Sequence, residues 1–145
     1  MDVNIEKFPI VFRERLKSGE VLLPKDIEIE YEPQKAYRCV FRDIGDAHII
    51  HREDMMSYAE LGKRPPKTLP DGIYNPEYYS TSFFISLDML KNKMAFPHPR
   101  KKAIVGYVHS AGGPCLRNEL TSHLSWWMYG DADISNFEFL EENDE

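Results

Sequence analysis

Hydrophobic and polar positions change their period along the chain, and each period predicts a different element. Residues 8–16 carry apolar side chains at a loosely helical spacing, and a Ser-Gly stop signal follows at 18–19, so a short helix or arm is expected. Residues 27–32, IEIEYE, alternate apolar and acidic side chains, which favours an edge or half-buried strand. Residues 36–41, AYRCVF, predict the next strand.

Helix and strand signals alternate again in the second third of the chain. Residues 52–61 favour a helix, and residues 63–77, with four prolines, predict an irregular loop of the kind that covers or lines a site. Residues 78–85, YYSTSFFI, predict a strand, and residues 86–94 a helix capped by its first serine. Residues 102–108, KAIVGYV, predict a buried strand at the centre of the sheet.

The predicted elements amount to one α+β domain with a mixed or antiparallel sheet as its core and a few short helices. Residues 124–130 and 136–140 supply the last two strands. The expected division is an N-terminal arm or helix at 1–26, an α+β core at 27–140 and an acidic tail at 141–145.

Charge and hydropathy limit the partners. The formal net charge of −6 repels phosphate backbones, so nucleic-acid binding is not expected. No apolar run approaches the roughly 20 residues that span a bilayer, and the N-terminus does not read as a signal peptide. We therefore expect a cytoplasmic protein without a membrane partner.

The cysteines and histidines give no metal motif. Cys39 and Cys115 are too few for a disulfide framework and read as buried thiols. Among the five histidines, His48 and His51 come closest to a ligand pair. No metal site is predicted.

The hydroxyl trio Ser80, Thr81 and Ser82 lies within a run of aromatic residues. Alternate strand residues share a face, so a core-facing Thr81 must find a backbone partner, while the two serines face a ligand or simply solvent. Arg38 in the middle of its strand suits a phosphate or a carboxylate ligand, and equally a salt bridge.

These pieces, in this order, resemble the ADP-ribosyltransferase fold of the arginine-serine-glutamate type. The matching segments are Tyr37-Arg38, the strand around 79–83 with its following helix, and the glycine-containing strand AIVGYV. The resemblance covers roughly residues 36–140 and implies that the protein binds NAD as a substrate. It further implies that Arg38 holds NAD, that Ser80 supports the pocket, and that Tyr79 or Phe83 packs on nicotinamide.

The chain departs from the family pattern at the glutamate. That family needs a carboxylate before its last apolar strand to stabilise an oxocarbenium-like ribose, and here His123 and Ser125 stand in that place. Glu119 lies too early in the sequence, and Glu138 too late, to match the position of the family's glutamate. Because this glutamate is missing, we expect the ADP-ribosyltransferase activity to be either altered or absent.

The adjacent indoles of Trp126 and Trp127 face opposite ways on a strand, so one must lie at a pocket, at a partner surface or under the N-terminal arm. The predicted catalytic residues are His123 and Arg38. The residues predicted to bind NAD or a related nucleotide are Arg38, Tyr79, Ser80, Ser82, Phe83 and Trp126. The alternative is a non-enzymatic acidic interaction module, a toxin-neutralising or regulatory protein that binds a protein partner.

Overall fold

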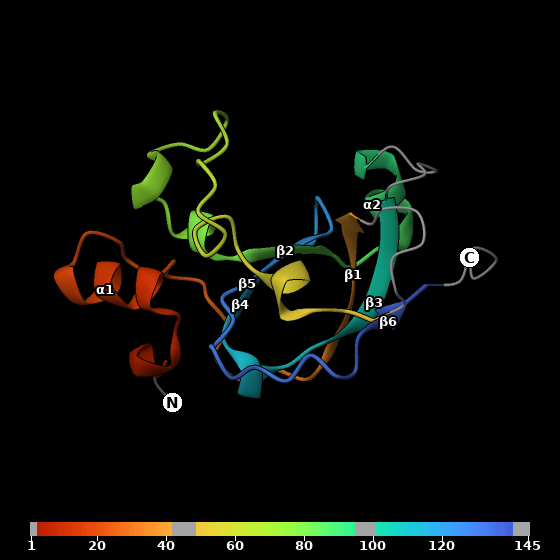
Figure 1. Ribbon diagram of the computed structural model, residues 1–145, viewed down its shortest axis with the longest axis horizontal. Coiled ribbons are helices and arrows are strands. Elements are labelled where there is room, and N and C mark those ends of the chain that lie inside the picture. Colours follow the sequence, from red (N-terminus) through yellow and green to blue (C-terminus); the bar gives the residue numbers. More distant parts are fainter. Residues whose placement is uncertain (1–2, 42–48, 95–100, 141–145) are drawn as a thin grey trace.

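The computed structural model describes residues 3–41, 49–94 and 101–140, which form an antiparallel sheet of six strands and two α-helices (Figure 1). In chain order the elements are α1 (Ile10–Ser18), β1 (Gln34–Phe41), β2 (Thr81–Phe84), α2 (Leu87–Met94), β3 (Lys101–Val108), β4 (Cys115–Asn118), β5 (His123–Trp126) and β6 (Glu138–Phe139). The α+β class and the antiparallel sheet are thus confirmed. The acidic tail predicted at 141–145 lies outside the described residues.

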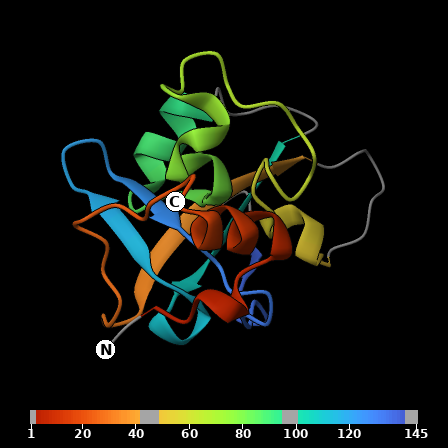
Figure 2. The same ribbon diagram turned by 90° about the vertical axis from the view of Figure 1, so that its left-hand side faces the viewer.

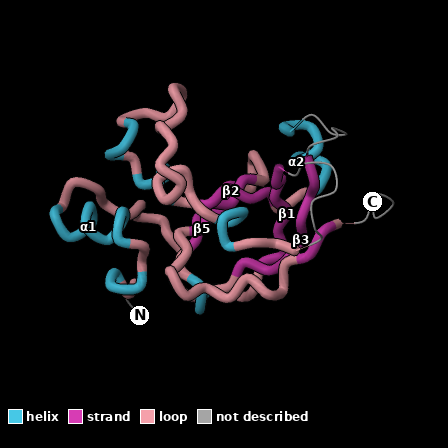
Figure 3. Tube along the Cα trace, in the orientation of Figure 1, coloured by secondary structure: helices cyan, strands magenta, loops and turns pink. Residues whose placement is uncertain are grey.

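The strand order across the sheet is β4-β5-β2-β1-β3-β6, with the strands in the middle of the molecule and long loops around them (Figure 3). β1 and β3 pair over eight positions, whereas β1 and β2 share one paired position, Tyr37 opposite Phe84. The two central strands therefore separate soon after they meet, and this separation positions the pocket described below.

Trp126 and Trp127 lie in two different hydrophobic clusters, as their opposite orientations predict. Trp126 packs with residues of the sheet such as Phe83, while Trp127 packs with Phe8 and Phe12 of the N-terminal segment. Both indoles are fully buried. One indole therefore lies under the N-terminal segment, whose helix α1 faces the viewer in Figure 2.

Several local predictions are confirmed. Helix α1 ends at Gly19, whose φ of 80° is the left-handed conformation that favours glycine at this position. The strand around Arg38 and the glycine-containing strand form as β1 and β3. The strand predicted at 78–85 forms only over Thr81–Phe84 as β2, because a 3-10 turn includes Tyr78 and Tyr79 and is capped by Ser80. Ser86 caps α2, since its Oγ accepts the Met89 backbone N–H at 3.4 Å.

The strand predicted at 27–32 is wrong, because this segment touches the sheet through a single bridge between Glu28 and Cys115. Side-chain contacts, instead of a ladder of backbone hydrogen bonds, hold this segment against the sheet. The Glu28 carboxylate pairs with the Arg117 guanidinium, and the Tyr31 hydroxyl donates to the Gly113 carbonyl at 2.7 Å.

Two other predictions need correction. The helix expected at 52–61 is only a 3-10 turn, η2 (Arg52–Met55), because the Ser57 hydroxyl accepts the Glu60 backbone N–H at 3.2 Å and competes with helical pairing. β3 was expected at the centre of the sheet, but it lies one strand from the edge, beside the two-residue β6. Within the described ranges, no helix is long and apolar enough to cross a membrane.

Candidate functional site

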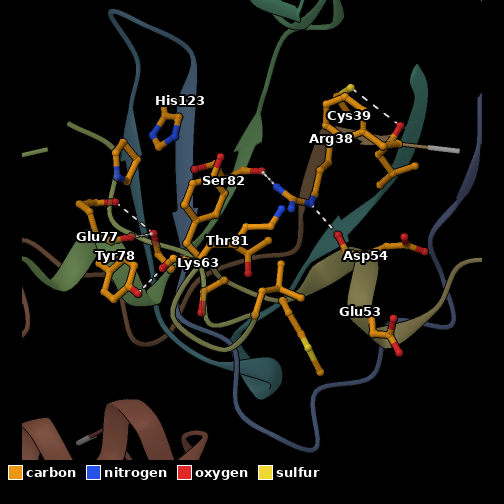
Figure 4. A pocket seen from close by; sticks show the side chains of 18 of the residues that line it. Arg38, Cys39, Glu53, Asp54, Lys63, Glu77, Tyr78, Thr81, Ser82 and His123 are labelled. Atoms are coloured by element: carbon orange, nitrogen blue, oxygen red, sulfur yellow. Dashed lines mark hydrogen bonds between the residues drawn. The ribbon is translucent and has the colours of Figure 1, made fainter. Parts of the chain in front are cut away.

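A pocket of about 660 Å³ lies where β1 and β2 separate. Its walls come from β1, β2, the start of β5, the turn η2, the loop at 56–69 and the 3-10 turn η4 (Pro76–Tyr79). Figure 4 shows Glu77 and His123 at one side of the pocket and Arg38 at the other, with Ser82 between them. The long loop predicted to line a site does contribute residues to this pocket.

Arg38 is partly buried and connects β1 to two neighbouring segments. Its Nε donates to the Asp54 carbonyl at 2.9 Å, and its Nη1 donates to the Ser82 carbonyl at 2.8 Å (Figure 4). Burial lowers the pKa of Arg38 from its ordinary value, and the nearby Cys39 and Asp54 partly offset this shift. Because both hydrogen-bond acceptors are neutral carbonyls, these bonds do not neutralise the guanidinium charge.

The three hydroxyl groups of the trio have three different environments. Thr81 is buried, and its Oγ1 donates to the Met55 carbonyl at 2.7 Å, which is the backbone partner predicted for a core-facing threonine. Ser82 is exposed and lines the pocket. Ser80 is buried, with its Oγ 2.8 Å from the Glu77 carbonyl and 3.1 Å from Glu77 Oε2.

Glu77 is the pocket residue that sequence reasoning missed. Its Oε2 accepts a hydrogen bond from Ser125 Oγ at 2.5 Å, and its backbone N–H is capped by Asn75 Oδ1 at 2.9 Å. Ser125 stands on β5, at the position where the family's carboxylate was expected. The Glu77 carboxylate therefore lies beside Ser125, and it comes from η4, the 3-10 turn before β2. The only local signal was its place at the end of the proline-rich loop.

His123 lines the same pocket from β5, opposite Phe84 of β2. Its ring lies edge-on to the Phe84 ring, with 5.8 Å between the centroids. Burial lowers the pKa of His123 below its ordinary value, although the Glu77 carboxylate acts in the opposite direction. The imidazole is therefore mostly neutral at pH 7, and a neutral imidazole has one hydrogen-bond donor and one acceptor.

This shift predicts a pH dependence of stability. Unfolded His123, with an ordinary pKa of about 6.5, takes up a proton more readily than the folded residue, so the protein loses stability as the pH falls below that value. We expect His123→Gln to lose less stability than the wild type between about pH 7.5 and about pH 5.5, as measured by thermal unfolding. Parallel pH profiles for the two proteins would contradict this assignment.

Three aromatic residues predicted to contact a cofactor lie in the hydrophobic clusters instead of the pocket lining. Tyr79 stacks on Phe12, with 4.8 Å between ring centroids, because it belongs to η4 and not to the strand. Phe83 is fully buried on the face of β2 opposite Ser82. Trp126, also fully buried, donates from Nε1 to the Gly113 carbonyl at 3.1 Å. The aromatic side chains of the lining are those of Phe41, Tyr58, Tyr78 and Phe84.

The cysteines do not offer a nucleophile. Cys115 is fully buried, and burial is the main cause that raises the pKa of its thiol to about 11. Burial also raises the pKa of Cys39, which lines the pocket. Both thiols therefore stay protonated near neutral pH. In the part of the chain that the structure describes, no three His, Cys, Asp or Glu side chains gather as a metal site. His48 lies outside that part.

Comparison of the chain with protein-family models, with curated proteins and with solved structures finds no match.

Proposed function

We propose that this pocket binds NAD and that the protein cleaves it to transfer ADP-ribose, on a fold related to the ADP-ribosyltransferases. The observation that carries the proposal is the meeting of Arg38, Ser80, Ser82 and His123 at one pocket. Arg38, Ser82 and His123 come from three neighbouring strands of the sheet, and Ser80 directly precedes β2. The family resemblance selects Arg38 and Ser80, whereas His123 stands where the family has its glutamate. The volume of about 660 Å³ falls within the range of roughly 300–1,000 Å³ that is usual for small-molecule sites.

The charges of the pocket suit NAD better than they suit a simple anion. NAD carries an anionic pyrophosphate, a cationic nicotinamide ring and two ribose diols. The pocket offers the cations of Arg38 and Lys63, hydroxyl groups from Ser80 and Ser82, and three carboxylates, those of Glu53, Asp54 and Glu77. Among the described residues, Arg38 Nη2 has no hydrogen-bond partner, and it is not fully buried, since no fully buried side-chain nitrogen lacks a partner. Its N–H groups suit a phosphate.

Thermal unfolding with added NAD tests the proposal. A ligand that binds only the folded state raises the free energy of unfolding, by about 2.7 kcal/mol at 100 times its dissociation constant, and therefore raises the unfolding midpoint as its concentration increases. We expect such a rise for the wild type and its loss in Ser82→Trp, which places an indole in the pocket from an exposed position. Ser135→Trp is the matched control, since Ser135 is exposed and lies outside the pocket lining.

Chromatography that measures the release of nicotinamide from NAD tests the proposed catalytic activity. An unchanged midpoint with NAD at about millimolar concentration would reject NAD binding. An equal rise in both tryptophan variants would place the binding site elsewhere.

A further inference from the structure

We infer that Glu77 supplies the catalytic carboxylate of the NAD reaction, in the place that a residue of β5 was expected to fill. This inference rests on the proposed function and adds the residue that acts on the nicotinamide ribose. It is carried by the position of the carboxylate, by the way its two oxygen atoms are used, and by the absence of an ion pair to it within the described residues.

The two oxygen atoms of Glu77 have different environments. Oε2 lies within hydrogen-bond distance of two serine hydroxyls, Ser80 Oγ at 3.1 Å and Ser125 Oγ at 2.5 Å. Oε1 has no hydrogen-bond partner among the described residues, and no buried side-chain oxygen in that set lacks one. Oε1 is therefore not fully buried, and Glu77 lines the pocket.

The backbone of Glu77 is held as firmly as its side chain. Pro76 occupies the first position of η4, and the Asn75 side chain caps the turn. The Trp127 indole donates from Nε1 to the Pro76 carbonyl at 2.8 Å, which ties this turn to a fully buried residue after β5. A carboxylate fixed by both its backbone and one of its oxygen atoms is preorganised for a reaction.

Glu77 forms no ion pair with any residue that the structure describes. The Glu77 carboxylate acts electrostatically on His123, which lines the same pocket and is mostly neutral at pH 7 because burial lowers its pKa. A ligand that develops positive charge is a chemically matched partner for this carboxylate.

The reaction with water as the acceptor shows what this charge does. The bond between C1′ of the nicotinamide ribose and the ring nitrogen breaks, and its electron pair leaves with nicotinamide, which becomes neutral. C1′ develops oxocarbenium-like positive charge, which the Glu77 carboxylate stabilises while Oε1 accepts a hydrogen bond from a ribose hydroxyl. Water then adds to C1′ and releases a proton, giving ADP-ribose.

The test compares Glu77→Gln with Glu119→Gln at saturating NAD. Glutamine keeps the size and the accepting oxygen of Glu77 but removes the charge, so we expect nicotinamide release to fall about 10²–10³-fold while the NAD-dependent rise of the unfolding midpoint remains. Glu119 is exposed in the turn between β4 and β5, outside the pocket lining, so Glu119→Gln should release nicotinamide at the wild-type rate. Ser125→Ala, which removes one hydroxyl from Oε2, should lower the rate by a smaller factor at unchanged NAD binding.

The outcomes separate this inference from the proposed function. A wild type that NAD does not stabilise would overturn both. A wild type that binds NAD without releasing nicotinamide, or a Glu77→Gln variant that binds and turns over NAD like the wild type, would overturn the role of Glu77 and leave NAD binding in place. If Glu77→Gln unfolds, the rate of the folded Ser125→Ala variant decides, and an unchanged rate overturns the inference.

Discussion

Trp127→Ala is expected to lower the free energy of unfolding by about 3–5 kcal/mol, a large part of the stability of a small domain. The indole is fully buried between the N-terminal segment and η4, where it packs with Phe8, Phe12 and Tyr79. Its removal leaves a cavity and leaves the Pro76 carbonyl without the Nε1–H that it now accepts. Urea unfolding followed by circular dichroism measures the change.

Two controls separate the packing of Trp127 from its hydrogen bond. Trp127→Phe keeps most of the apolar volume and loses the N–H, so it should destabilise the protein by less than the alanine variant. Leu120→Ala should change stability by less than about 0.5 kcal/mol, because Leu120 is 97% exposed. A loss below about 1 kcal/mol in Trp127→Ala would contradict the docking of the N-terminal segment on this indole. In the expected case, residues 8–16 should also exchange amide hydrogens faster than β1 and β3.

Local sequence signals are sufficient to predict the structure where a single residue type determines it. Gly19 ends α1 because its positive φ suits glycine, and Ser86 starts α2 with its hydroxyl. The period of two along a strand predicts that Trp126 and Trp127 lie in separate clusters and that Thr81 needs a backbone partner, and the structure shows both. These features depend on neighbours in sequence or on the two faces of one strand.

Features decided by contacts distant in sequence could not be predicted. The bond between Glu77 and Ser125 joins residues 48 positions apart, and no period or motif connects them. The segment 27–32 has a strand pattern, yet Glu28 is held by Arg117, 89 positions away. Such tertiary contacts outweigh the local strand propensity, because each contact adds charge-assisted or buried hydrogen bonds.

The sequence predicts several of the polar residues that line the pocket, but it does not predict which aromatic residues do. Arg38 and Ser82 were selected for chemistry that few core positions accept, so their placement at a pocket follows from the cost of burying polar groups. Phe83 and Tyr79 satisfy the core as readily as a ligand, and both are buried in it. An aromatic residue beside a polar motif is therefore weaker evidence of a binding site than the polar residues themselves.

Arg38→Met is expected to reduce both stability and NAD binding, because the guanidinium has a structural and a ligand-facing part. Its loss leaves the Asp54 and Ser82 carbonyls without their donors, which should cost about 2–4 kcal/mol, while methionine keeps the contact of the stem with the core. Arg38→Lys keeps the charge but cannot reproduce the planar fork, so it should retain part of the NAD effect with a similar loss of stability. Urea unfolding and the NAD-dependent midpoint measure the two effects separately. A fully stable Arg38→Met variant would show that β1, η2 and β2 are held together without this side chain, and an undiminished NAD effect would remove Arg38 from the binding site.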